Sequence, residues 1–189
     1  MILQEKDYIH KKKKKYLILS IIWTSMVIAI FIVGLVLTGT RANLFTVSAC
    51  LLAIVASLFI TRCISFGRYK DGDKERAKML EDLKGNMHIY HSGIVPYDKG
   101  TAYFEHILVT TEKIYFIAYT KEQVEKYGKW VQELLGGKGI SSKQIKFLVA
   151  QDKDQMKKHT DRIEKELENC DTQKNPIDVY SNKINEILM

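Results

Sequence analysis

The sequence predicts a two-helix transmembrane hairpin followed by a small cytosolic α/β (α+β) domain. Two long apolar segments lie before residue 70, and the rest of the chain has the mixed composition of a soluble domain. The charge balance changes at the same place, because residues 1–70 contain 10 basic and 2 acidic residues, whereas residues 71–189 contain 19 and 20. The formal net charge of +7 therefore comes from the membrane-proximal part.

The two apolar segments are long enough to cross a bilayer. Tyr16–Leu37 and Leu44–Thr61 contain no charged residue, and roughly 20 apolar residues cross a hydrocarbon core about 30 Å thick. We expect spans at positions 16–37 and 44–64, joined by a loop so short that the helices are antiparallel neighbours. The first segment is too long for the apolar core of a cleaved signal peptide.

The basic residues predict the orientation of this hairpin. They flank the outer ends of both spans and are rare in the loop: Lys6, Lys11–Lys15, Arg62, Arg68 and Lys70, against Arg41 alone. Because cytoplasmic segments are enriched in lysine and arginine, we expect a two-pass protein of the cell membrane with both termini in the cytoplasm. The run Lys11–Lys15 also predicts attraction to anionic lipid headgroups, by about 1 kcal/mol per residue.

The remaining 119 residues or so suffice for one domain with one core. Composition and periodicity divide the chain into five segments. These are a polybasic N-terminus (1–15), the transmembrane hairpin (16–64), a juxtamembrane helix (65–84), an α/β domain (85–170) and a C-terminal amphipathic helix (171–189).

The α/β domain is expected to begin with strands and continue with alternating helices and strands. Short extended pieces at 87–90 and 92–95 surround a bend and precede turn residues at 96–100. Residues 101–110 and 113–119 are rich in β-branched and aromatic residues and predict an antiparallel hairpin.

A helix follows at 122–135, and Gly136-Gly137 ends it. The strand at 144–150 is expected to be a parallel partner, reached by this crossover. A charged helix at 152–169 follows, and Asn175-Pro176 begins the last helix.

Several common site types are excluded. The string Gly136-Gly-Lys-Gly139 lacks the spacing of a phosphate-binding loop. His88 and His91 point to opposite faces of an extended segment and cannot jointly hold a metal there. Three scattered cysteines predict no disulfide framework.

Glu105 and His106 are the polar residues of interest on the predicted hairpin. Adjacent strand residues face opposite ways, so one of the two is directed at the covered side of the sheet. A charged group there needs a partner, because burying an unpaired charge costs several kcal/mol. The alternative is that Glu105 faces solvent or pairs with Lys113 across the hairpin.

The string GTAYFEHILVTTEKIYFIAY, residues 100–119, resembles the centre of the nuclease-related domain (NERD), a family of the restriction-endonuclease-like superfamily. The resemblance implies an αβββαβ core, which is compatible with the expected order of elements. In that family, an acidic residue followed by His lies on one strand, and the next strand ends in acidic-x-Lys. The carboxylates hold a divalent ion such as Mg²⁺, and the lysine stabilises the charge that develops in phosphodiester cleavage.

This chain matches the family pattern in part. Glu105 occupies the first acidic position and His106 the following histidine. The second acidic position falls on Ala118 and the lysine position on Thr120, with Lys121 one residue late. The candidate catalytic residues are therefore Glu105, His106 and Lys121, with Glu105 as the one matched metal ligand.

The sequence is compatible with three alternative functions. The first is a membrane-anchored protein whose cytosolic, non-catalytic nuclease-like domain acts in binding or assembly, through a protein partner or self-association, without a cofactor. The second is a membrane-tethered, Mg²⁺-dependent nuclease. The third is a small accessory subunit of a membrane complex. A nucleic-acid partner is not expected, because a nearly neutral domain gains little from counterion release.

Overall fold

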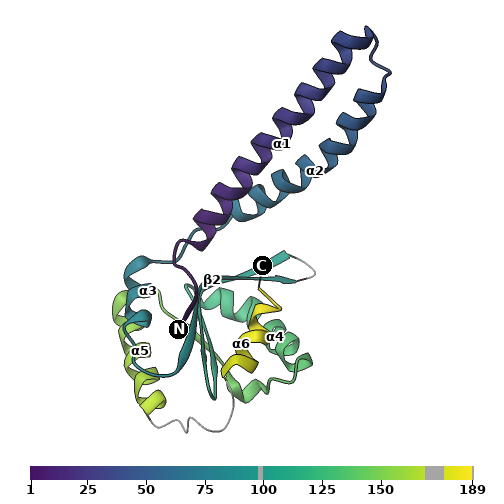
Figure 1. The fold of residues 1–189 in the computed structure, drawn as a ribbon. Coiled ribbons are helices and arrows are strands. Elements are labelled where there is room, and N and C mark those ends of the chain that lie inside the picture. Colours follow the sequence, from purple (N-terminus) through teal and green to yellow (C-terminus); the bar gives the residue numbers. More distant parts are fainter. Residues whose placement is uncertain (98–99, 169–176, 189) are drawn as a thin grey trace. The chain divides into compact units, whose positions relative to one another are not determined.

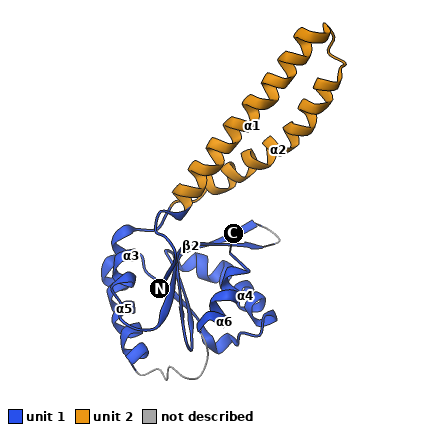
Figure 2. Cartoon of the chain, viewed as in Figure 1, with its two compact units in different colours: residues 1–8, 71–189 blue, residues 9–70 orange. Residues whose placement is uncertain are grey.

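The computed structural model describes residues 1–97, 100–168 and 177–188 (Figure 1). The chain forms two compact units, one of residues 1–8 and 71–189 and the other of residues 9–70 (Figure 2). The second unit is therefore inserted into the first, close to the beginning of the chain. Each unit is described by itself.

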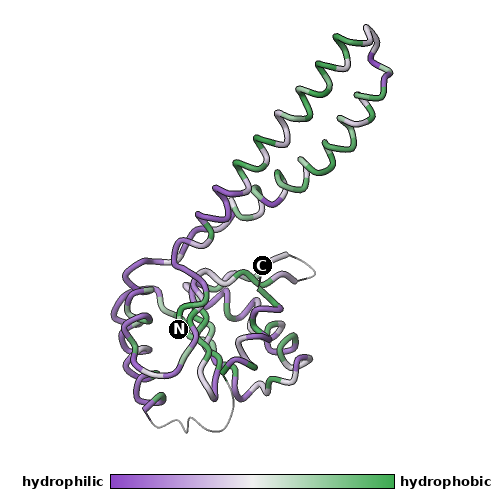
Figure 3. The backbone as a smooth tube through the Cα atoms, in the orientation of Figure 1, coloured by the Kyte–Doolittle hydropathy of each residue, from purple (hydrophilic) through white to green (hydrophobic). Residues whose placement is uncertain are grey.

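The inserted unit is a hairpin of two long helices, α1 (Tyr8–Thr38) and α2 (Leu44–Gly67). Both are long and apolar enough to cross a membrane, with mean hydropathies of 2.5 and 2.4 over their most apolar windows. Only 11% of each window is buried, so most of the apolar side chains are exposed. Figure 3 shows the hydrophobic residues running along both helices. Helix α1 is longer than the predicted span, because the lysine run at residues 11–15 is helical as well.

The turn between the two helices is held by side-chain hydrogen bonds. The side chain of Asn43 caps α2 by accepting from the Thr46 amide at 2.8 Å, and its Nδ2 donates to Gly34 O at 3.2 Å. A Cβ at Gly34 would lie 2.4 Å from Phe45 Cβ, so glycine permits the close approach of the helices. Further along, Trp23 stacks on Phe59 with ring centroids 6.2 Å apart.

The other unit is built on a five-stranded mixed sheet with the strand order β1-β2-β3-β4-β5. The central pairs β2–β3 and β3–β4 are antiparallel, whereas β1 and β5 each pair in parallel with their neighbour. The strands are β1 (Ile2–Gln4), β2 (Met87–Tyr97), β3 (Gly100–Thr110), β4 (Ile114–Ala118) and β5 (Ile145–Val149).

Helices cover both faces of this sheet. Helices α3 and α5 lie on one face, and α4 and α6 lie on the other (Figure 1). A short 3₁₀ helix, η1 (Ser142–Gln144), precedes β5. The helices are α3 (Lys74–Glu81), α4 (Lys121–Gly137), α5 (Lys153–Glu168) and α6 (Ile177–Asn185).

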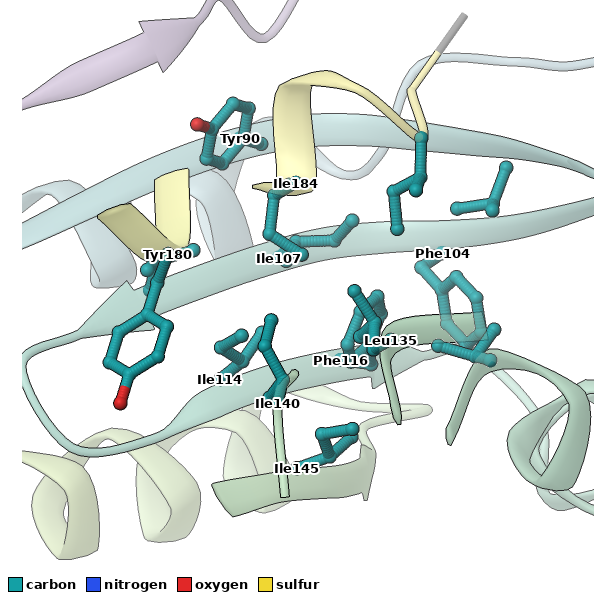
Figure 4. Close-up of a cluster of buried hydrophobic side chains, with 14 of the residues drawn as sticks. Tyr90, Phe104, Ile107, Ile114, Phe116, Leu135, Ile140, Ile145, Tyr180 and Ile184 are labelled. Carbon is teal, nitrogen blue, oxygen red and sulfur yellow. The ribbon is translucent and has the colours of Figure 1, made fainter. Parts of the chain in front are cut away.

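The larger core lies between the sheet and helices α4 and α6. Phe104 and Phe116 meet edge to face at 5.0 Å, and Ile184 of α6 packs over Ile107 of β3 (Figure 4). The smaller core joins α3 and α5 to the other face through Leu80, Met156 and Ile163. Each face of the sheet is therefore covered by an apolar core, and a polar side chain on either face is buried unless it lies at the margin of that core.

The order α3-β2-β3-β4-α4-β5 is the one expected, and both the antiparallel hairpin and the parallel pairing of β5 are confirmed. Strand β1 was not predicted, because three residues are too few to show the alternation of apolar and polar side chains that is typical of a strand. The bend within β2 is a single residue, Ser92, with a φ of 59°. The expected start of the last helix at Asn175-Pro176 lies outside the described residues.

Three of the expected segments divide differently in the structure. Residues 1–8 join the α/β unit rather than a separate polybasic terminus. The segment 65–84 contains the end of α2 and the whole of α3, separated by a non-helical stretch, instead of one juxtamembrane helix. Helix α6 belongs to the main core, because Ile177, Tyr180 and Ile184 are buried in it.

Candidate functional site

Glu105 lies on β3 with only 4% of its side chain exposed, on the face covered by α3. Its Oε1 accepts two hydrogen bonds of 2.7 Å, one from Arg76 Nη2 and one from the Asp73 amide. The expectation that Glu105 faces solvent or pairs with Lys113 is wrong, because Lys113 instead contacts Glu166 at 2.6 Å. Glu105 is thus a buried carboxylate paired through Oε1, and its Oε2 has no hydrogen-bond partner among the described residues.

The local sequence before α3 explains this pairing. Asp73 is the N-cap of α3, and its carboxylate accepts from the amides of Glu75 and Arg76 at 2.9 and 3.0 Å. This cap fixes the first turn of the helix, from which Arg76 reaches the sheet. A Cβ at Gly72 would lie 2.6 Å from Glu105 Cγ, so a side chain at that position would displace the carboxylate.

Arg76 has two further contacts besides its ion pair. Its Nη1 donates to Gln151 O at 2.9 Å, and its guanidinium lies 5.3 Å from the centre of the Tyr119 ring. The side chain is 11% exposed. Arg76 thus joins α3 to β3, to the end of β4 and to the segment after β5.

His106 also faces α3, although it is adjacent to Glu105. A Cβ at Gly72 would meet His106 Cε1 at 3.1 Å as well as Glu105, so both side chains lie on one side of the strand. The expected alternation is wrong here. Glu105 lies opposite Ser92, where no residue pair forms between His91–His106 and Gly93–Phe104 and where Ser92 has a left-handed φ of 59°. The fold therefore brings Glu105 and His106 together.

His106 forms a buried pair with His91 on β2. Their Nδ1 atoms are 2.9 Å apart, and the rings are perpendicular. His91 Nε2 lies 3.3 Å from Glu81 Oε1, close enough for an ion pair although not aligned as a hydrogen bond. Glu81 in turn contacts Lys6 at 2.7 Å.

This geometry favours one arrangement of the imidazole protons. A proton on His91 Nε2 would face the Glu81 carboxylate, which leaves His91 Nδ1 to accept from His106 Nδ1. His106 Nε2 is then unprotonated and carries a buried lone pair, for which the described residues offer no hydrogen-bond donor. Burial is the main cause that lowers the pKa of His106 to about 3, aided by the charges of His91 and Arg76, and burial also lowers the pKa of His91.

His88 points to the other face of β2, as predicted from the strand period. Its Nδ1 lies 2.6 Å from Ser181 Oγ on α6. His88 and His91 are therefore separated by the sheet and do not form a joint site.

Lys121 is not part of the buried group. It begins α4, is exposed, and lies 3.5 Å from Glu125 one turn later. Ala118 is fully buried at the end of β4, and Thr120 is the N-cap of α4, in a capping box with Gln123. Because His106 pairs with Ile117, Glu105 lies beside Ala118 on the neighbouring strand. The positions matched by sequence are thus adjacent in space, but they carry no second carboxylate and no lysine.

The donor set around Glu105 does not fit a divalent ion. Within the described ranges, no three His, Cys, Asp or Glu side chains are grouped so that they could hold a metal. A positive guanidinium already lies 2.7 Å from Glu105 Oε1, where a second cation would be repelled. No catalytic step is assigned through a metal here.

Fold and site together define a small α/β domain with a mixed five-stranded sheet and a buried arginine–glutamate pair beside it. The sequence profile of the nuclease-related domain family matches residues 69–183, more than half of the chain. The chain therefore belongs to the NERD family. No curated protein and no solved structure matches the sequence.

Sequence reasoning missed Arg76, Asp73, Gly72 and His91 as members of this group. Asp73, in the string Asp71-Gly-Asp73 before a helix, can be predicted from the sequence as an N-cap. It gives no indication of which strand residue the capped turn contacts, because that contact depends on the packing of α3 on the sheet.

Replacing Arg76 by alanine should lower the free energy of unfolding by about 3–5 kcal/mol, because it leaves a buried carboxylate without its cation. Urea unfolding of the full chain in detergent measures this loss. Lys78→Ala, an exposed lysine on the same helix, is the matched control, with an expected change within about 0.5 kcal/mol. The double variant Arg76→Met/Glu105→Leu should recover most of the loss, and an Arg76→Ala variant as stable as the control would contradict the ion pair.

The free energy of unfolding should also fall as the pH drops below about 6.5. Between pH 6.5 and 3 the unfolded chain binds a proton at His106 that the folded chain does not, so acid favours unfolding. For His106 alone this amounts to about 2 kcal/mol between pH 6.5 and 5. Urea unfolding at a series of pH values measures this dependence. His106→Asn keeps a donor toward His91 and should reduce the dependence of the free energy of unfolding on pH, whereas His159→Asn on α5 should leave it unchanged. The same pH dependence in the wild-type protein and both variants would show that His106 is not held neutral.

Proposed function

We propose that this protein is a two-pass membrane-anchored member of the NERD family whose cytosolic domain acts by binding or assembly rather than by cleaving nucleic acid. The observation that carries this proposal is the ion pair between Arg76 and Glu105. The carboxylate that the family pattern would assign to a metal is neutralised by the protein's own cation.

The rest of the family pattern supports the same reading. Metal-dependent phosphodiester cleavage needs carboxylates that hold the ion and a cation that stabilises the developing charge. Ala118 and Thr120 occupy those positions, and Thr120 has a structural role as a helix cap. Lys121, the nearest lysine in sequence, is exposed and lies beside Glu125.

Membrane anchoring is supported by the length and composition of α1 and α2. The lysine run Lys11–Lys15 suits anionic lipid headgroups at the end of α1, and the excess of basic residues on that side favours a cytosolic location of the α/β unit. Since residues 71–189 contain 19 basic and 20 acidic residues, a protein partner or a second copy fits this unit better than nucleic acid.

A cleavage assay tests the absence of catalysis. Full-length protein in lipid nanodiscs is incubated with duplex DNA, single-stranded DNA and RNA in the presence of Mg²⁺ or Mn²⁺. We expect no cleavage above that of Glu105→Gln, a variant that keeps a hydrogen-bond acceptor for Arg76. Cleavage by the wild-type protein that Glu105→Gln loses would establish a nuclease and overturn the proposal.

Cysteine labelling in cells tests the orientation. In a background without Cys50, Cys63 and Cys170, the variants Arg41→Cys and Lys129→Cys are treated with a membrane-impermeant maleimide. We expect Arg41→Cys to react in intact cells and Lys129→Cys to react only after permeabilisation. The reverse pattern would place the α/β unit outside the cytoplasm, and labelling of both in intact cells would exclude a cytosolic α/β unit.

A further inference from the structure

A groove runs along the flank of the α/β unit between β5 and α5. Three adjoining hollows form it, and each pair of hollows has at least one α5 residue in common: Lys158, His159 or Arg162. Two of them contact β5, whereas the largest, of about 600 Å³, lies between α5 and the turn before β4. The hollow at one end contacts Val149 and the one at the other end contacts Lys113. Because α5 runs back along β5, the groove is parallel to the strand.

The lining of this groove is predominantly basic. Lys158, Arg162 and Lys165 recur at i, i+4 and i+7, which places them on one side of α5. The other walls contribute Lys113, Lys121 and Lys146. The acidic lining residues are Glu112, Asp161 and Glu166, so this surface is positive in a unit that is nearly neutral overall.

One of the acidic residues has its charge compensated within the groove. Glu166 contacts Lys113 at 2.6 Å and Arg162 at 3.2 Å, and it accepts from the Tyr115 hydroxyl at 2.5 Å. Although partial burial raises it, these hydrogen bonds lower the pKa of Glu166 to about 2, so the ion pairs persist at neutral pH. Lys146 and Lys158 have exposed side chains and no ion pair among the described residues, which leaves their charges available to a ligand.

The backbone of β5 gives the groove a second property. Strand β5 is the last strand of the sheet and pairs on one side with β4. The Ala150 amide donates to Ala118 O, so the alternation of a strand directs the N–H and C=O groups of Phe147 and Val149 away from β4. Consistent with this direction, Val149 O accepts from the side chain of His159 at 3.0 Å rather than from a strand. An edge strand of this kind can accept an added strand.

We propose that the groove between α5 and β5 binds an acidic segment of a protein partner, in extended conformation, as an added strand on β5. The N–H and C=O of Phe147 and the N–H of Val149 supply main-chain hydrogen bonds to the ligand, while Val149 O stays bonded to His159. The lysines and Arg162 supply charge complementarity. An extended peptide presents its carboxylates at intervals and tolerates Glu112 and Asp161 between the basic residues, whereas a nucleic-acid backbone carries a charge at every unit. This inference rests on the proposed binding function of the α/β unit and assigns that function to the groove between α5 and β5.

A direct binding measurement tests this inference. Full-length protein in nanodiscs of zwitterionic lipid is titrated into a fluorescent ten-residue peptide of alternating glutamate and valine, at low salt. We expect saturable binding that the double variant Lys146→Glu/Lys158→Glu weakens at least tenfold. The matched control Lys126→Glu/Lys129→Glu makes the same charge change on exposed residues of α4 and should change the affinity less than twofold.

Modified probes distinguish strand addition from charge attraction alone. Two versions of the peptide carry N-methyl groups at odd or at even positions, and only the version methylated on its β5-facing edge should lose binding. Equal affinity of both versions, no peptide binding, or equal weakening by both double variants would overturn the inference. Preferential binding of a labelled single-stranded oligonucleotide would also overturn it, in favour of a nucleic-acid groove. None of these outcomes alters the result of the cleavage assay, so the failure of one proposal is separable from that of the other.

Discussion

The ion pair between Arg76 and Glu105 is the interaction on which the centre of the α/β unit depends. It joins α3 to the middle of β3, and the Asp73 amide adds a second bond to the same carboxylate oxygen. A buried carboxylate is expensive to desolvate, so its position is stable only while both donors are present. The same requirement fixes the start of α3, because Asp73 caps the helix from which Arg76 extends.

The neighbouring histidines extend this constraint to the N-terminal segment. His106 contacts His91, His91 lies beside Glu81, and Glu81 contacts Lys6. Residues on β3, β2, α3 and the segment before α1 are thus linked by polar contacts within a mostly apolar layer. Such a network orders its members most strongly when all of its groups are partnered. Among the described residues, four buried atoms of this network have no hydrogen-bond partner: Arg76 Nε, His91 Nε2, Glu105 Oε2 and His106 Nε2.

Local sequence patterns were sufficient for the order of the elements from α3 to β5, and insufficient for β1 and for the site. The β-branched and aromatic run of β3 and β4, and the apolar stripe of α4 ended by two glycines, are signals within one segment. The pairing of Glu105 with Arg76 joins residues 29 positions apart, and the common direction of Glu105 and His106 depends on the backbone of Ser92. Strand β1 is formed by its contact with β2 rather than by its own three residues. The family resemblance pointed to Glu105 as a residue of interest, but its pairing with Arg76 could not be predicted from a motif centred on the strands.

The insertion of the helical hairpin after β1 has a consequence for the assembly of the sheet. Strand β1 leaves the ribosome before α1 and α2, and its partner β2 follows more than 80 residues later. In a flexible chain, closing a loop of this length has a substantial entropic cost. Once α1 and α2 lie side by side, with Tyr16 stacked on Phe66 at 5.6 Å, the two ends of the insertion are already close together. Packing of α1 against α2 therefore lowers the cost of adding the first strand, so that formation of the helical hairpin and completion of the sheet become thermodynamically coupled events.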